Sequence, residues 1–117
     1  MAVRAAPSQA ITRLGNAMEL VDIDMAGVAR IVDKDPKTVS RWLRHQTEPR
    51  WEAREMLLAL GVVLERLAQV MERGAAEDWL FTPVPLLDYQ RPVDLLRRGE
   101  HRPVLGLVDA IGEGVFT

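Results

Sequence analysis

Residues 24–45 read DMAGVARIVDKDPKTVSRWLRH, and this stretch predicts two short helices joined by a tight turn. Asp24 precedes the first helix, where its carboxylate can accept hydrogen bonds from the free N–H groups of the first turn. Asp35 can cap the second helix in the same way, and Pro36 suits the first helical position because it has no N–H to leave unpaired. We therefore expect one helix to begin after residue 24 and the next after residue 35.

The apolar residues of these two helices are spaced to meet across an angled helix pair. They are Val28, Ala29, Ile31, Val32, Val39, Trp42 and Leu43. The small Ala29 lets two steeply crossing helices approach closely, and a basic second helix completes a helix-turn-helix pattern. The turn lacks the glycine often found there, so we expect Asp33 or Lys34 to adopt an unusual backbone conformation.

The second helix leaves a polar and basic face exposed, formed by Lys37, Thr38, Ser40, Arg41 and Arg44. In a helix-turn-helix unit this helix enters the major groove, where its first residues reach base edges and flanking cations neutralise phosphates. We predict that Lys37, Thr38 and Arg41 contact base edges or nearby phosphates of operator DNA, and that Arg44, Arg30 and Arg50 contact the DNA backbone. The alternative is that these side chains form only a solvated helix face.

The longest periodic run covers residues 51–73 and is followed by Gly74, a residue type that often ends helices. An apolar stripe in this run steps by three and four residues, through Leu57, Leu60, Leu64, Leu67 and Met71. It is widened by Leu58, Val62, Val63 and Val70. About two heptads are too few to indicate a coiled coil. The width favours burial on two sides, so we expect contact with the chain's own core and with a second copy, giving a homodimer.

The rest of the chain also shows helical patterns. Ile11, Leu14, Met18 and Val21 recur at helical spacing after Ser8, a candidate N-cap. Short helices are predicted over 75–81, 86–89, 92–98 and 103–111, separated by proline and glycine. No alternating β-branched run indicates a strand, so the fold is predicted to be all-α. We divide it into a helix-turn-helix region (1–50), a connecting and dimerisation helix (51–74) and a small C-terminal helical domain (75–117).

Composition limits the class of protein. The chain has 117 residues and no cysteine, as expected for a protein with its own core in a reducing cytoplasm. No apolar run has the length of a signal peptide or a membrane span, so we expect no membrane contact. The net charge of −2 excludes a polycation that coats nucleic acid indiscriminately. Cations outnumber anions over residues 25–50 and anions outnumber cations from residue 75 onward, which predicts two surfaces with two kinds of partner.

Residues able to act in catalysis or metal binding are few. Ser8 lies near the N-terminal arm, Ser40 lies on the predicted DNA-facing helix, and His101 lies between two charged residues. With His45 the chain has two histidines and no thiol, which make no zinc site. No glycine loop follows a strand to hold a phosphate. The sequence therefore predicts a protein that is not an enzyme and that needs no cofactor or metal.

Residues 78–116, DWLFTPVPLLDYQRPVDLLRRGEHRPVLGLVDAIGEGVF, carry a series of short motifs. These are Trp79-Leu80, Pro83, Leu87, the box RPVDLL at 91–96 ending at Gly99, and IGEGV at 111–115. In this order, behind a helix-turn-helix with Arg41-Trp42 in its second helix, they resemble the Xre/MbcA/ParS-type antitoxins of bacterial toxin–antitoxin operons. Among these the chain is most similar to the MbcA-like members.

The resemblance implies a cognate toxin of the RES class, an enzyme that consumes NAD or transfers ADP-ribose from it. In that family the C-terminal domain docks on the toxin, its tail lies over the toxin's NAD cleft, and the N-terminal domain binds the operon's promoter. The chain is then part of a homodimer or of a higher hetero-oligomer with the toxin. The resemblance implies toxin contacts by the tail and its supporting box, which are Gly112, Glu113, Gly114, Val115, Phe116, Thr117, Arg91 and Asp94.

Physical chemistry is consistent with such a tail. Flexible glycines and two apolar anchors, Val115 and Phe116, allow a terminal segment to enter a concave site. Glu113 and the terminal carboxylate can meet cations that otherwise hold a pyrophosphate. Two alternatives stay open: Arg91 and Asp94 only cap a helix, or the chain is a stand-alone repressor whose C-terminal half only dimerises.

Overall fold

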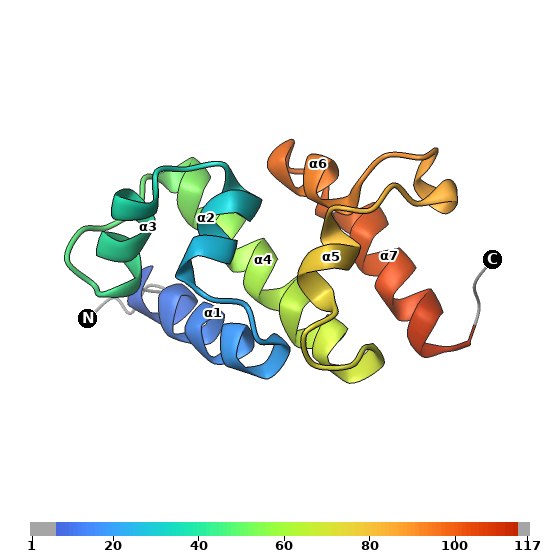
Figure 1. Cartoon of the computed structure of the whole chain (residues 1–117). Coiled ribbons are helices and arrows are strands. Elements are labelled where there is room, and N and C mark those ends of the chain that lie inside the picture. Colours follow the sequence, from blue (N-terminus) through green and yellow to red (C-terminus); the bar gives the residue numbers. More distant parts are fainter. Residues whose placement is uncertain (1–6, 115–117) are drawn as a thin grey trace, which may run out of the picture.

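The computed structural model describes residues 7–114, and within this range the chain is built from helices without a strand (Figure 1). The helices are α1 (Pro7–Val21), α2 (Met25–Val32), α3 (Pro36–Leu43), α4 (Trp51–Val70), α5 (Ala76–Leu80), the short 3-10 helix η1 (Pro85–Leu87), α6 (Pro92–Arg97) and α7 (His101–Gly112). The prediction of an all-α fold is confirmed. None of these helices is long and apolar enough to span a bilayer.

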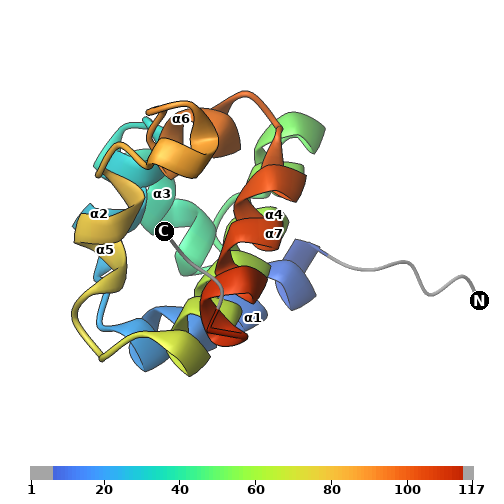
Figure 2. The ribbon, with the colours of Figure 1, turned by 90° about the vertical axis from the view of Figure 1, so that its right-hand side faces the viewer.

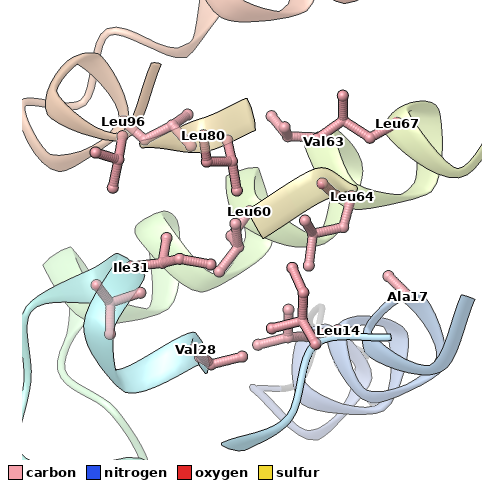
Figure 3. Packing of buried hydrophobic residues seen from close by; sticks show 14 of the residues in the cluster. Leu14, Ala17, Val28, Ile31, Leu60, Val63, Leu64, Leu67, Leu80 and Leu96 are labelled. Carbon is pink, nitrogen blue, oxygen red and sulfur yellow. The ribbon is translucent and has the colours of Figure 1, made fainter. Parts of the chain in front are cut away.

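Helix α4 forms the centre of the molecule, with α1 packed along one side and α7 along the other (Figures 1 and 2). Its stripe is buried as predicted, through Leu57, Leu60, Leu64 and Leu67. Leu14 and Ala17 of α1 pack against this stripe. The backbones of α1 and α4 are in contact at Gly61, where an added Cβ would lie 3.6 Å from Leu14 Cα. Val28, Ile31, Leu80 and Leu96 reach the same core from α2, α5 and α6 (Figure 3).

The second side of the α4 stripe is covered by α7 of the same chain rather than left open for a second copy. Val63 is fully buried and Val62 and Val70 are half-buried, so this chain accounts for most of the predicted apolar width. Leu58 remains 38% exposed. The width of the stripe is therefore a weaker argument for a dimer than the sequence suggested.

Helix α4 also ends earlier than predicted, at Val70 instead of residue 73. Met71 is already extended, with φ −131° and ψ 155°. The chain must leave the helix here because Gly74, at φ +98°, donates its N–H to the Val21 carbonyl at 3.2 Å and starts the return toward α5. Gly74 thus forms a tertiary turn rather than the helix cap predicted from the sequence.

The local features predicted for α2 and α3, their caps, their turn and their inner face, are present in the structure. Asp24 Oδ1 accepts a hydrogen bond from Gly27 N at 2.8 Å, and Asp35 Oδ1 accepts one from Lys37 N at 2.7 Å. The unusual backbone conformation falls on Asp33, at φ 58° and ψ 51°, a region that aspartate tolerates better than most residues. The predicted inner face is buried except for Leu43, which is half-buried. These local features orient α3 with its basic face outward.

In the C-terminal half the predicted helices are present with shifted ends. The largest shifts are two residues: η1 ends at Leu87 and not at residue 89, and α7 begins at His101 and not at Pro103. A proline is tolerated there because the first helical N–H groups have no intrahelical partner to lose. Helices α5 and α6 lie on the same side of α4 as α2 and α3 (Figure 2). A contact between α2 and α6 joins the helix-turn-helix to the C-terminal half.

Candidate functional site

The outer face of α3 carries three exposed cations, Lys37, Arg41 and Arg44. Thr38 and Ser40 lie on the same helix and are half-buried, so the structure brings all five predicted DNA-facing residues onto one element. Helix α3 stands at one end of the molecule, where no other helix covers its outer face (Figure 1). An exposed basic helix is the kind of element that DNA-binding proteins insert into a major groove.

The cations of this face differ from most other described cations because they form no ion pair with a carboxylate. Within residues 7–114 no carboxylate pairs with the cations of α3 or with their neighbours in sequence, Lys34, Arg50 and Arg54. Elsewhere in this range Arg102 also lacks such a partner. A patch of uncompensated cations attracts polyanions, whereas paired cations have little charge left to offer. The other described arginines are paired with carboxylates: Arg13, Arg30, Arg66, Arg73, Arg91, Arg97 and Arg98.

Arg30 does not belong to this patch. Its guanidinium forms an ion pair with Glu77 of α5, and its Nε donates to Glu77 Oε2 at 3.1 Å. The Glu77 hydrogen bond raises the pKa of Arg30 above its usual value. This ion pair is a feature that the sequence did not predict, and the contact of Arg30 with DNA phosphates stays a prediction. The sequence could not reveal Glu77 as its partner because the two residues are far apart in the chain.

At the other end of the chain, Arg91 and Asp94 bind each other. Arg91 Nε and Nη2 donate to the two carboxylate oxygens of Asp94 at 2.9 and 2.8 Å. These hydrogen bonds lower the pKa of the Asp94 carboxyl below its usual value, and partial burial opposes them. Arg91 is the N-cap of α6 and Asp94 lies in its first turn, so the pair braces the start of that helix. The box supports the C-terminal domain by fixing α6.

Arg97 is a structural residue that the sequence patterns did not indicate. Its Nε donates to the Ile31 carbonyl at 2.9 Å and its Nη2 to the Arg30 carbonyl at 2.6 Å, so that α6 caps the end of α2. Arg91 and Arg97 also approach the Phe81 ring, with Cζ 5.6 and 5.8 Å from its centroid. No local pattern signals these contacts because the carbonyls belong to a helix more than sixty residues earlier.

The predicted tail begins in helix α7. Gly112 is the last residue of α7, and an added Cβ would lie 2.9 Å from Val70 Cγ1. The absence of a side chain at residue 112 allows the end of α7 to pack against α4. The prediction that Gly112 belongs to a flexible segment is therefore wrong, because this residue is helical. Glu113 and Gly114 follow the helix and are exposed, with Gly114 at φ +80°. Val115, Phe116 and Thr117, the remaining predicted toxin contacts, lie outside the described residues.

Comparison with known proteins places these features in a family. No protein-family model matches the chain. The mycobacterial cidal antitoxin MbcA of Mycobacterium bovis and of Mycobacterium tuberculosis is 39% identical over 104 residues, which are 89% of this chain and 92% of the relative. The crystal structure of the M. tuberculosis MbcT–MbcA toxin–antitoxin complex contains a chain of the same fold, with TM-score 0.79 and 37% identity. That match covers 92% of this chain and 96% of the other. Identity over nearly the whole length, together with the shared arrangement of helices, shows that the chain belongs to the MbcA family of antitoxins.

Proposed function

We propose that this antitoxin neutralises a cognate RES-type toxin, an enzyme that degrades NAD or transfers ADP-ribose from it. The C-terminal part, residues 75–117, docks on the toxin, and the tail from Glu113 to Thr117 covers the NAD cleft. The helix-turn-helix part, residues 1–50, binds the operator of the operon in the cytoplasm and represses its transcription. The relative of known structure was crystallised with its toxin, which supports a toxin as the partner.

The observation that carries the DNA-binding part is the segregation of uncompensated cations onto α3 and its neighbours in sequence. If this were only a solvated helix face, its cations would be expected to be paired as often as those elsewhere. Elsewhere in the described chain all but one of the arginines have carboxylate partners. The toxin-facing part rests on the exposed end of α7, which lies at the far end of the molecule from α3 (Figure 1). The distance between the two ends lets one molecule hold DNA and toxin at once.

The toxin-binding part is tested by co-expression with the product of the adjacent toxin gene. We expect the two proteins to co-purify, and NAD consumption by the toxin to fall to background when the antitoxin is equimolar. If NAD consumption continues at the rate of free toxin, the chain is better described as a stand-alone repressor whose C-terminal half only dimerises.

Substitution Arg41→Ala is expected to weaken operator binding about tenfold, because one cation at the groove is lost. The slope of log affinity against log salt should decrease by about one, since fewer counterions are released. Both quantities are measured by titrating labelled operator DNA at several salt concentrations. Arg66→Ala removes the same charge from an arginine paired with Asp109, and serves as the control. An equal effect of the two substitutions would remove Arg41 from the interface.

We also propose that the antitoxin is a homodimer, alone or within a larger complex with the toxin, because helix-turn-helix proteins commonly read two half-sites. Trp51 and Leu58 are exposed two turns apart on α4 and provide an apolar surface for a second copy. Light scattering is expected to give twice the chain mass of 13.1 kDa. A mass of one chain at micromolar concentration would contradict the proposal.

A further inference from the structure

The segment between α5 and α6 exposes two large side chains, Leu86 at 52% and Tyr89 at 71%. Among the described residues after α4, no other large apolar side chain is as exposed. We call Leu86 and Tyr89 the apolar knob. Burial of a leucine and an aromatic ring is favourable, so leaving both side chains in water forgoes that stabilisation.

The segment that presents the knob is tightly hydrogen-bonded. Val84 and Gln90 form a bridge, with Val84 N donating to the Gln90 carbonyl at 3.1 Å, and Tyr89 N donates to the Val84 carbonyl at 2.9 Å. Leu87 is buried beneath it, and Arg98 Nη2 donates to Gln90 Oε1 at 2.8 Å. The exposed side chains therefore project from a pre-organised base, which lowers the entropy that binding must overcome.

The backbone at the knob is strained. Asp88 and Tyr89 are consecutive non-glycine residues in the left-handed region, at φ 59° and 62°. Such residues persist where the surrounding structure holds them, and here the hydrogen bonds of the turn do so. This conformation leaves Tyr89 as the most exposed large apolar side chain of the described chain.

Charge and position limit what that partner can be. Residues 82–90 contain no Lys or Arg, and Asp88 is exposed between the two knob residues, so a polyanion such as DNA is unsuitable. The segment lies at the end of the molecule opposite α3, as does the end of α7 (Figure 1). A partner can therefore cover the knob without obstructing the DNA-facing helix. A second copy of the chain is the alternative occupant, since a two-fold contact can place the knob of each copy against a different part of the other. The mass of the antitoxin alone distinguishes the two occupants in the test below.

We propose that the apolar knob inserts into an apolar depression on the toxin and supplies most of the affinity of the complex, in addition to the tail. A matching depression would offer a polar group to the Tyr89 hydroxyl and a cation to Asp88, because these are the polar groups that the segment exposes. This inference rests on the proposed function, because it assigns a second contact to the same partner. Tyrosine is enriched among interface residues that dominate binding energy, and a rigid pair of anchors is typical of such hot spots.

The test compares the double variant Leu86→Ala/Tyr89→Ala with Leu20→Ala, which removes a leucine of similar exposure, 55%, from α1. The probe is the purified product of the adjacent toxin gene, titrated against each protein by calorimetry. We expect the double variant to bind toxin at least about 30-fold more weakly than the wild type. Leu20→Ala should change the affinity less than twofold, and both variants should bind operator DNA normally.

A second variant, Tyr89→Gly, distinguishes loss of the side-chain contact from a defect in folding. Glycine occupies φ 62° without strain, so this substitution should raise the unfolding temperature while weakening toxin binding. The inference is overturned if the wild type binds toxin and the knob variants bind it equally well. It is also overturned if the knob substitutions change only the oligomeric mass of the antitoxin measured without toxin. If wild type itself binds no toxin, it is the proposed function that fails.

Discussion

Removal of residues 113–117 is expected to restore NAD consumption by the toxin to the level seen without antitoxin. The reason is geometric, because inhibition in the proposed mechanism requires a segment that fills the NAD cleft, and these residues follow the last residue of α7. Among the described residues, Glu113 and Gly114 contribute hydrogen bonds at the end of α7, such as Gly114 N to the Ile111 carbonyl, and the deletion removes these. The knob and the braced α6 remain, so the truncated protein should still bind toxin.

Three measurements distinguish this outcome from a general defect. NAD consumption is followed with toxin alone, with wild-type antitoxin and with the truncated protein at equimolar and tenfold excess. Thermal unfolding and operator binding should match those of the wild type. The knob variant gives the converse result, weak binding with an intact tail, so the two variants together separate docking from occlusion. If the truncated protein inhibits as well as the full chain, inhibition acts through another surface.

Substitution Arg97→Ala is expected to lower the free energy of unfolding by about 2–4 kcal/mol, from two lost charge-assisted hydrogen bonds. For a domain of this size the unfolding temperature should fall by about 10 °C. The carbonyls of Arg30 and Ile31 at the end of α2 would each lose a hydrogen bond from Arg97, and the Arg30 carbonyl would keep the one from Asp33 N. Because the lost contact joins α6 to α2, the helix-turn-helix should loosen from the C-terminal half as well.

The measurement is thermal denaturation followed by circular dichroism, together with amide exchange in α2 and α6. Arg66→Ala is again the control, since its ion pair with Asp109 is exposed and such pairs contribute about 0–1 kcal/mol. Arg97→Lys keeps the charge but lacks the planar fork that reaches two carbonyls, and should recover less than half of the loss. An unfolding temperature within about 2 °C of wild type for Arg97→Ala would show that the hydrogen bonds of Arg97 contribute little to the contact between α2 and α6.

Much of this protein is determined by local sequence. The caps at Asp24 and Asp35, the left-handed Asp33 and the buried stripe of α4 depend on residues within one or two turns, and all of them agree with prediction. The prediction that the chain is not an enzyme, based on its missing catalytic sets, is confirmed by membership of an antitoxin family. The order of short motifs over residues 78–116 is sufficient to indicate that family, because each motif is a local run of residues.

Other features were decided only by the tertiary structure, because their partners are distant in the chain. Arg30 and Arg97 look like ordinary helix cations until folding brings Glu77 and the α2 carbonyls to them. Gly112 appears flexible until α7 packs against Val70, and nothing in the predicted helix over 86–89 indicates that Leu86 and Tyr89 remain exposed. Sequence determines which helices form and which faces are apolar, since these depend on neighbours along the chain. Which charges are neutralised and which apolar groups remain uncovered depends on neighbours in space.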